Sequence, residues 1–165
     1  MTGPSGRERD APRAEGGTAP RAARAAGGGT RRQARERALG MLYESATKGI
    51  RPDEVVDAQP VAPDAFAVEL TVGVGAHSAE LDDMIRRFAK GWRPERMPVL
   101  DLMLLRMGAF ELTHRPDVPT AAAISEAVDL ARRFSTEDSG RFVNGVLARI
   151  AEEVRPGDAR PAPRR

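Results

Sequence analysis

The chain has 165 residues, enough for one small domain, and its net charge is +2. Almost all of its basic residues are arginines, because lysine occurs only at positions 48 and 90. It contains no cysteine, which excludes disulfides, thiolate metal sites and cysteine nucleophiles. The N-terminus has no signal-peptide pattern, and no segment is apolar over a membrane-spanning length. We therefore expect a cytoplasmic protein without a membrane partner.

Composition separates a central region from two tails. Residues 1–30 contain no Val, Ile, Leu, Phe, Trp or Tyr, and residues 156–165 are rich in Pro and Arg. Such segments bury too little apolar surface to offset the entropy lost on ordering, so we expect both to be disordered. The expected folded region is 31–155, with an N-terminal half at about 31–77 and a C-terminal half at about 78–155.

Apolar residues recur at helical spacing throughout this region, and strand patterns are nearly absent. The expected helical segments, in chain order, are 31–48, a short turn from 52 to 60, 63–77, 79–90, a very apolar segment within 95–114, 120–134 and 136–154. The pattern predicts an all-α fold of six or seven helices.

Several residues mark the ends of these helices. Thr30, Ser78 and Ser135 precede helical segments and are predicted N-caps, and Asp138 would complete a variant capping box with Ser135. Pro119 suits the first position of its helix, whereas Gly49 and Gly91 are predicted stops. Gly73 and Gly75 would permit a neighbouring element to approach closely.

Sites of chemistry are few. The two histidines, His77 and His114, have no second histidine or cysteine at ligand spacing, so we expect no metal site. The sequence lacks a nucleophile elbow and a phosphate-binding loop, and we expect no catalytic residue, no cofactor and no enzymatic activity. Asp101 and Arg106 interrupt the most apolar helix; paired charges at the core edge are the favoured interpretation, and a partner-docking site is the alternative.

Two helix surfaces favour binding. On the first helix, Arg35 and Tyr43 follow one flank with Arg32 beside them, a basic strip that could meet phosphates and a base. The alternative is a solvated face on which Tyr43 closes the core edge. On the last helix, Phe142 lies about 100° from Val143, at the margin of the apolar stripe. It is accompanied there by Arg141.

The order and content of several motifs resemble one family. They are RRQARERALGMLY at 31–43, LRMGAFEL at 105–112, DVP at 117–119, ISEAVDLA at 124–131 and EDSGRFVNGVL at 137–147. Together they are similar to the NusB family of bacterial transcription antitermination factors over about residues 31–155.

The resemblance implies two helical bundles packed crosswise and a non-catalytic function. It implies binding to the boxA element, a single-stranded segment of nascent ribosomal RNA, jointly with NusE, a ribosomal small-subunit protein, and action within an RNA polymerase antitermination complex. It leaves open whether the chain forms a homodimer. The residues it implicates in RNA binding are Arg31, Arg32, Arg35, Tyr43, Arg141 and Phe142. Those it places toward the partner protein are Asp101 and Asp138, and the arginine motif departs from the family at Gln33.

Two alternatives from other classes stay open. The chain could be a helical protein-protein adaptor that does not bind RNA. It could also be a stand-alone relative of the accessory domain found in ribosomal RNA methyltransferases, without the glycine-rich cofactor site that such an enzyme needs.

Overall fold

The computed structural model describes residues 27–158, so most of both expected tails lies outside the described residues. Within that range there are seven α-helices, one short 3-10 helix and no strand, which confirms the all-α prediction. No helix in this part of the chain combines the length and apolarity needed to cross a membrane. The helices are α2 (Gly27–Lys48), α3 (Pro52–Asp57), α4 (Ala65–Ala76), α5 (Ser78–Phe88), α6 (Val99–His114), α7 (Thr120–Phe134) and α8 (Glu137–Val154), and the 3-10 helix η1 (Pro94–Arg96) precedes α6.

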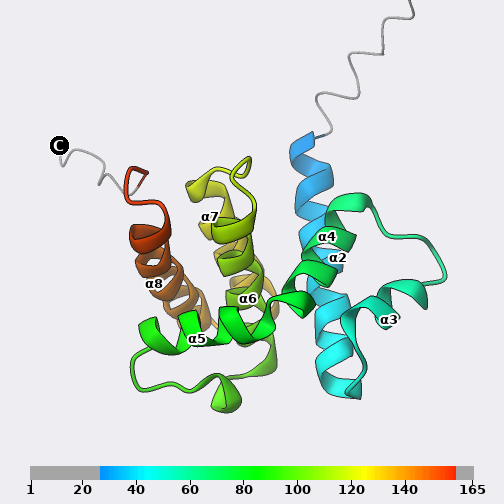
Figure 1. The fold of residues 1–165 in the computed structure, drawn as a ribbon, viewed down its shortest axis with the longest axis horizontal. Coiled ribbons are helices and arrows are strands. Elements are labelled where there is room, and N and C mark those ends of the chain that lie inside the picture. Colours follow the sequence, from blue (N-terminus) through cyan, green and yellow to red (C-terminus); the bar gives the residue numbers. More distant parts are fainter. Residues whose placement is uncertain (1–26, 159–165) are drawn as a thin grey trace, which may run out of the picture.

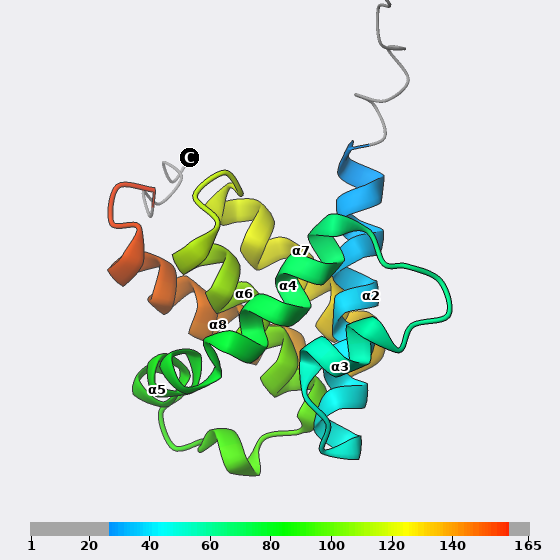
Figure 2. The same ribbon diagram turned by 45° about the vertical axis from the view of Figure 1, so that its right-hand side comes forward.

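Helix α6 is the centre of the molecule. It packs against α2, α4, α5, α7 and α8, which explains why its sequence is apolar nearly all round. Helices α2, α3 and α4 contact one another on one side, and α7 and α8 form a pair on the other (Figure 1). In the turned view, α4 runs obliquely between α2 and α6 (Figure 2).

Glycines let helices approach closely at three places. A Cβ atom at Gly73 would lie 2.2 Å from Cζ of Phe110, and one at Gly75 would lie 2.8 Å from Cγ of Pro52. The predicted close approach at these two positions is therefore confirmed. On α6, a Cβ at Gly108 would lie 2.5 Å from Cδ1 of Leu147, so the contact between α6 and α8 also depends on a missing side chain.

The helix ends differ from the expected caps at three positions. Helix α2 begins at Gly27, which places Thr30 inside the helix. One residue, His77, joins α4 to α5 and occupies the cap position, so Ser78 is the first residue of α5 and makes no capping bond. Helix α8 is capped by Thr136, whose Oγ1 accepts from Ser139 N at 3.0 Å.

Two predicted stops are glycines in left-handed conformation. Gly49 has φ +67° directly after α2, as expected. Gly91 has φ +83°, but α5 already ends at Phe88, so the glycine turns the connection rather than terminating the helix. Pro119 precedes the first residue of α7 instead of occupying it.

Candidate nucleic-acid interface

Two arginines at the start of α2 form exposed ion pairs with acids from other elements. Arg31 reaches Asp117 at 3.2 Å, and Arg32 makes two hydrogen bonds to Glu126 at 3.1 and 3.0 Å. Their side chains are 41% and 57% exposed. An exposed pair such as Arg31–Asp117 contributes roughly 0–1 kcal/mol, so an RNA phosphate could displace the Asp117 carboxylate at small cost. The Arg32–Glu126 pair is bidentate and its carboxylate is only 17% exposed, so it is held more firmly.

Arg35 differs from these two because it is buried. Its guanidinium makes three hydrogen bonds to the Glu111 carboxylate, the shortest at 2.7 Å, and both side chains are almost fully covered. Burial raises the pKa of Glu111, and the Arg35 hydrogen bonds oppose that shift. Leu39, on the same flank of α2, is buried too. The expected basic strip is therefore wrong at Arg35, because this flank of α2 packs against α6.

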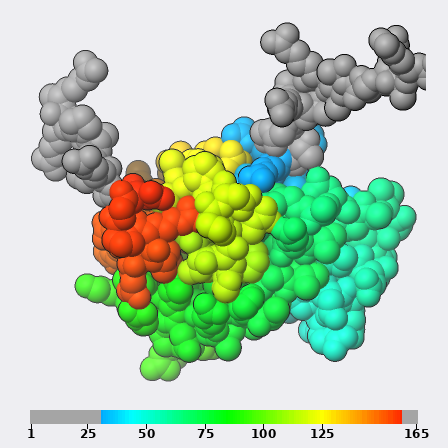
Figure 3. All heavy atoms as spheres, turned by 45° about the horizontal axis from the view of Figure 1, so that its top comes forward, coloured from blue at the N-terminus to red at the C-terminus, as the bar shows by residue number. Residues whose placement is uncertain are grey.

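The turn between α6 and α7 is fixed from both sides. Arg155, just after α8, donates to the carbonyl oxygens of Val118 at 2.6 Å and Arg115 at 2.8 Å. Asp117 in the same turn binds Arg31 of α2, and hydrogen bonds from Arg115 hold the pKa of Asp117 well below its usual value. In Figure 3 this yellow-green turn lies between the red end of α8 and the blue start of α2.

A groove of mixed polar and apolar lining between α7 and α8 extends this surface. Arg141 is exposed at its α8 wall, and Arg32 of α2 approaches Asp129 on the α7 wall at 3.9 Å. Arg32 and Arg141, far apart in the chain, thus both adjoin α7, and Arg31 contacts the turn that precedes it. The groove is lined by Ala121, Ile124, Ser125, Val128, Asp129, Arg132, Gly140, Arg141 and Asn144.

Next to Arg141, an aromatic pair reaches the surface. Phe142 is half-buried against the core, at the margin of the α8 stripe as the helical wheel predicts, and its ring lies 5.6 Å from the Trp92 ring, centroid to centroid. Trp92 is 50% exposed. Its neighbours Arg93 and Arg96 are exposed as well and form no ion pair within residues 27–158.

Trp92 lies between the helical segments expected at 79–90 and within 95–114, and helical spacing did not predict this aromatic pair. The available signal was the run Trp-Arg-Pro-Glu-Arg at 92–96, which places an aromatic ring among arginines. Periodicity could not place it beside Phe142, because the two residues lie in different elements 50 positions apart.

Asp101 and Asp138, both placed by the resemblance toward a partner protein, have opposite environments. Asp101 is buried and accepts hydrogen bonds from the hydroxyls of Ser135 and Ser139, each at 2.9 Å. Ser135 is thereby engaged with α6, which is why Thr136 caps α8 in its place. The Asp138 side chain is 93% exposed, 4.0 Å from Arg141.

A second, apolar groove lies between α2, α6 and α7. Tyr43 and Phe134 are 45% and 43% exposed along it, and Leu100 forms part of its wall. Leu100 and Phe134 are the chain neighbours of Asp101 and Ser135, so the hydrogen bond between Ser135 and Asp101 ties the α6 wall of the groove to the end of α7. Tyr43 therefore belongs to an apolar surface that does not include Arg31, Arg32 or Arg141. The groove is lined by Glu36, Leu39, Gly40, Tyr43, Leu100 and Phe134.

The chain is similar to known proteins over most of its length. The NusB family model matches residues 32–152. A transcription antitermination protein NusB from Kineococcus radiotolerans is 42% identical over 127 residues, covering 74% of this chain and 93% of the relative. The transcription antitermination protein NusB from Sorangium cellulosum is 45% identical over 132 residues, which cover 76% of this chain and 94% of the relative.

Solved structures show the same fold. NusB of T. maritima superimposes with a TM-score of 0.67 at 31% identity, covering 74% of this chain and 91% of that one. A complex of the antitermination factors NusB and NusE with double-stranded RNA matches with a TM-score of 0.62 at 27% identity, covering 75% and 97%. The match extends over most of the chain at both the sequence and the structural level, and this protein belongs to the NusB family.

Proposed function

We propose that the protein is a non-catalytic transcription antitermination factor that binds the boxA element of nascent ribosomal RNA jointly with NusE and acts on RNA polymerase. The observation that carries the proposal is the exposed basic and aromatic surface around α7 and α8, on a fold similar to NusB in a complex with NusE and RNA.

The RNA surface combines two kinds of contact. Arg31, Arg32 and Arg141 are exposed. Arg31 and Arg141 face exposed carboxylates and are available to phosphates, whereas Arg32 also holds the largely covered carboxylate of Glu126. Phe142 and Trp92 offer ring surface on which unstacked bases of a single strand can stack. Arg35 contributes indirectly, because its buried pair with Glu111 fixes α2 on α6 and so positions Arg31 and Arg32.

The apolar groove is the proposed NusE surface. Exposed Tyr43 and Phe134 supply the aromatic area that protein interfaces favour. The Asp101 carboxylate supports its wall from behind through Ser135, and does not itself face the partner. Asp138 is exposed at the start of α8 and is free to contact a partner or to orient Arg141.

A titration of labelled boxA RNA, with and without NusE, tests the proposal. We expect affinity to fall with salt by roughly 0.7 log units per log unit of salt for each phosphate neutralised, and Arg141→Ala to reduce that slope. Arg51→Ala is the matched control: it removes an exposed arginine from the start of α3, remote in sequence from every residue of the RNA surface.

Two results would contradict the proposal. An equal loss of affinity in Arg51→Ala and Arg141→Ala would show that binding is non-specific. Absence of RNA binding both with and without NusE would favour the protein-protein adaptor.

A further inference from the structure

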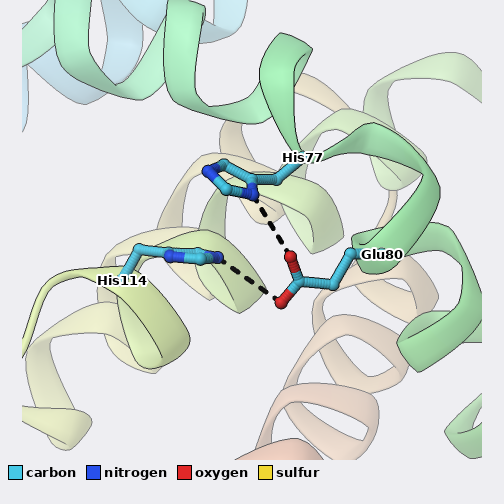
Figure 4. Close-up of side chains that lie close together, drawn as sticks. All are labelled: His77, Glu80 and His114. Atoms are coloured by element: carbon cyan, nitrogen blue, oxygen red, sulfur yellow. Dashed lines mark hydrogen bonds and ion pairs between the residues drawn. The ribbon is translucent and has the colours of Figure 1, made fainter.

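The two histidines of the chain meet in space although 37 positions separate them. His77 lies between α4 and α5, His114 ends α6, and their rings stack with centroids 4.0 Å apart. Glu80, in the first turn of α5, points its carboxylate at both rings (Figure 4). Neither histidine has a second histidine or cysteine at ligand spacing in the sequence; the two come together because α4 and α5 fold back against α6.

The donor atoms have the spacing of a metal site. His77 Nδ1 lies 3.2 Å from Glu80 Oε2, and His114 Nε2 lies 3.5 Å from Glu80 Oε1. One donor atom from each of the three residues lies within 4.8 Å of the other two. Ligands bound tetrahedrally to zinc at about 2.0–2.2 Å are separated by roughly 3.3 Å, so these donors are close enough to share an ion. Because imidazole lone pairs lie in the ring planes, binding would require the two stacked rings to rotate until their planes converge on that ion.

Among the three side chains, His114 contributes a buried ring nitrogen, Nε2, whose hydrogen-bonding capacity is unused within residues 27–158. It is shielded from solvent and has no hydrogen-bond partner among the described residues; the approach to Glu80 is too long or poorly directed to serve as one. Buried polar nitrogens normally have a partner, and an ion coordinated by this nitrogen would supply it.

The surrounding packing holds the rings in place. The Phe110 ring stacks against His114 at 5.1 Å and lies 6.0 Å from His77, centroid to centroid. Phe110 fits there because Gly73 has no side chain. The site thus has rigid apolar support on one side, while the side chains of His77, Glu80 and His114 keep 40%, 50% and 30% of their area exposed.

We propose that His77, Glu80 and His114 form a binding site for a divalent transition-metal ion of the zinc class, with water as the remaining ligand. Two imidazole nitrogens and one carboxylate suit zinc and disfavour magnesium and calcium, which prefer oxygen ligands. A bound ion would link the α4–α5 junction to the C-terminal end of α6. Its effect would be to stabilise the fold, independently of the proposed RNA binding.

Calorimetric titration of the tag-free full chain with zinc tests this site, with cobalt as a spectroscopic probe of tetrahedral coordination. We expect one equivalent of zinc to bind and to raise the melting temperature. His77→Gln, His114→Gln and Glu80→Gln should each weaken zinc binding by at least about tenfold, equivalent to about 1.4 kcal/mol. Asp83→Asn, which removes another exposed carboxylate of α5, should leave the affinity unchanged.

Zinc bound in the titration can be assigned to this site, because the chain has no cysteine and no third histidine to bind zinc elsewhere. Circular dichroism of each variant without metal checks that it folds. The proposal is overturned if the wild-type chain binds no zinc, or if His77→Gln and His114→Gln bind it as tightly as the wild type does.

Discussion

At the scale of single residues, burial separates side chains that look equivalent in the sequence. Arg31, Arg32 and Arg35 belong to one arginine-rich run, yet the first two are exposed and the third is covered by α6. The helical wheel placed Arg35 correctly on the flank of α2. It could not show that Arg35 forms a buried ion pair with Glu111, which lies 76 positions further along the chain.

Replacing Arg35 tests its structural role. Arg35→Met leaves the buried Glu111 carboxylate without its partner, so we expect a loss of about 3–5 kcal/mol in the free energy of unfolding. The double variant Arg35→Met with Glu111→Leu should recover most of that loss, because no buried charge remains. Urea denaturation measures both; a stable Arg35→Met with reduced RNA affinity would instead support direct RNA contact by Arg35.

The aromatic pair gives a second prediction at this scale. Trp92→Ala removes a half-exposed ring, so we expect RNA binding to weaken by about 1–3 kcal/mol if a base stacks on it, with little change in stability. Phe142→Ala should weaken RNA binding and also destabilise the fold, because Phe142 packs against the core. RNA titration and thermal melting of each variant distinguish these effects.

Phe134→Ala is the matched control, since it removes an aromatic residue of similar exposure from the apolar groove. It should leave RNA affinity unchanged while weakening NusE binding. Equal RNA affinity of Trp92→Ala and the wild type would remove Trp92 from the RNA surface.

At the scale of helices, α8 is held on α6 by a polar contact and an apolar one. Asp101 accepts from the hydroxyls of Ser135 and Ser139 near the start of α8. Further along, Gly108 lets Leu147 approach the α6 backbone. Since Arg141 and Phe142 lie between these two contacts in the chain, the packing of α8 on α6 sets the position of the proposed RNA surface.

Two glycine-to-alanine changes should have effects of opposite sign. Gly108→Ala places a Cβ against the buried side chain of Leu147, and we expect a loss of about 1–3 kcal/mol in stability from overpacking. Gly145→Ala is also within a helix but meets nothing within 4 Å, so its higher helix propensity should stabilise the protein by up to about 1 kcal/mol. Urea denaturation would contradict this account if both variants changed stability in the same direction.

At the scale of the whole molecule, ion pairs connect elements distant in the chain. Asp117 in the α6–α7 turn binds Arg31 of α2, and Arg115 of the same turn binds Glu69 of α4. Around this turn, α2, α4, α7 and the end of α8 are tied together.

The low pKa of Asp117 predicts a pH-dependent contribution to stability. The Arg115 hydrogen bonds lower this pKa below its ordinary value of 3.8, so the folded state favours the carboxylate more than the unfolded state does. The stabilisation is complete above pH 3.8 and is lost as the pH falls toward the folded pKa. It should be modest, because Asp117 is half exposed.

Asp117→Asn measures that contribution. We expect the variant to be less stable than the wild type near neutral pH, and the difference to narrow as the pH falls below about 3.8. Urea denaturation at neutral pH and at about pH 3 gives both values. A difference that stayed constant over this range would show that the carboxylate charge is not what stabilises the turn.

Local patterns in the sequence were sufficient for much of the architecture. Helical spacing predicted the helices, the very apolar segment within 95–114 is the helix at the centre of the fold, and Gly73 and Gly75 marked a close approach. The capping of α8 could not be predicted in the same way. Ser135 and Thr136 are both suitable caps, and the choice between them follows from the Asp101 carboxylate on α6.

The sequence by itself determined the all-α fold, the family and the exposed basic-aromatic end of α8, because these depend on residues close together in the chain. The tertiary structure alone decided which arginines are buried, that Trp92 lies beside Phe142, and that His77 and His114 meet at Glu80. Such contacts join side chains from different helices. Their distances are set by how the helices pack around α6, and periodicity within one segment carries no information about that packing.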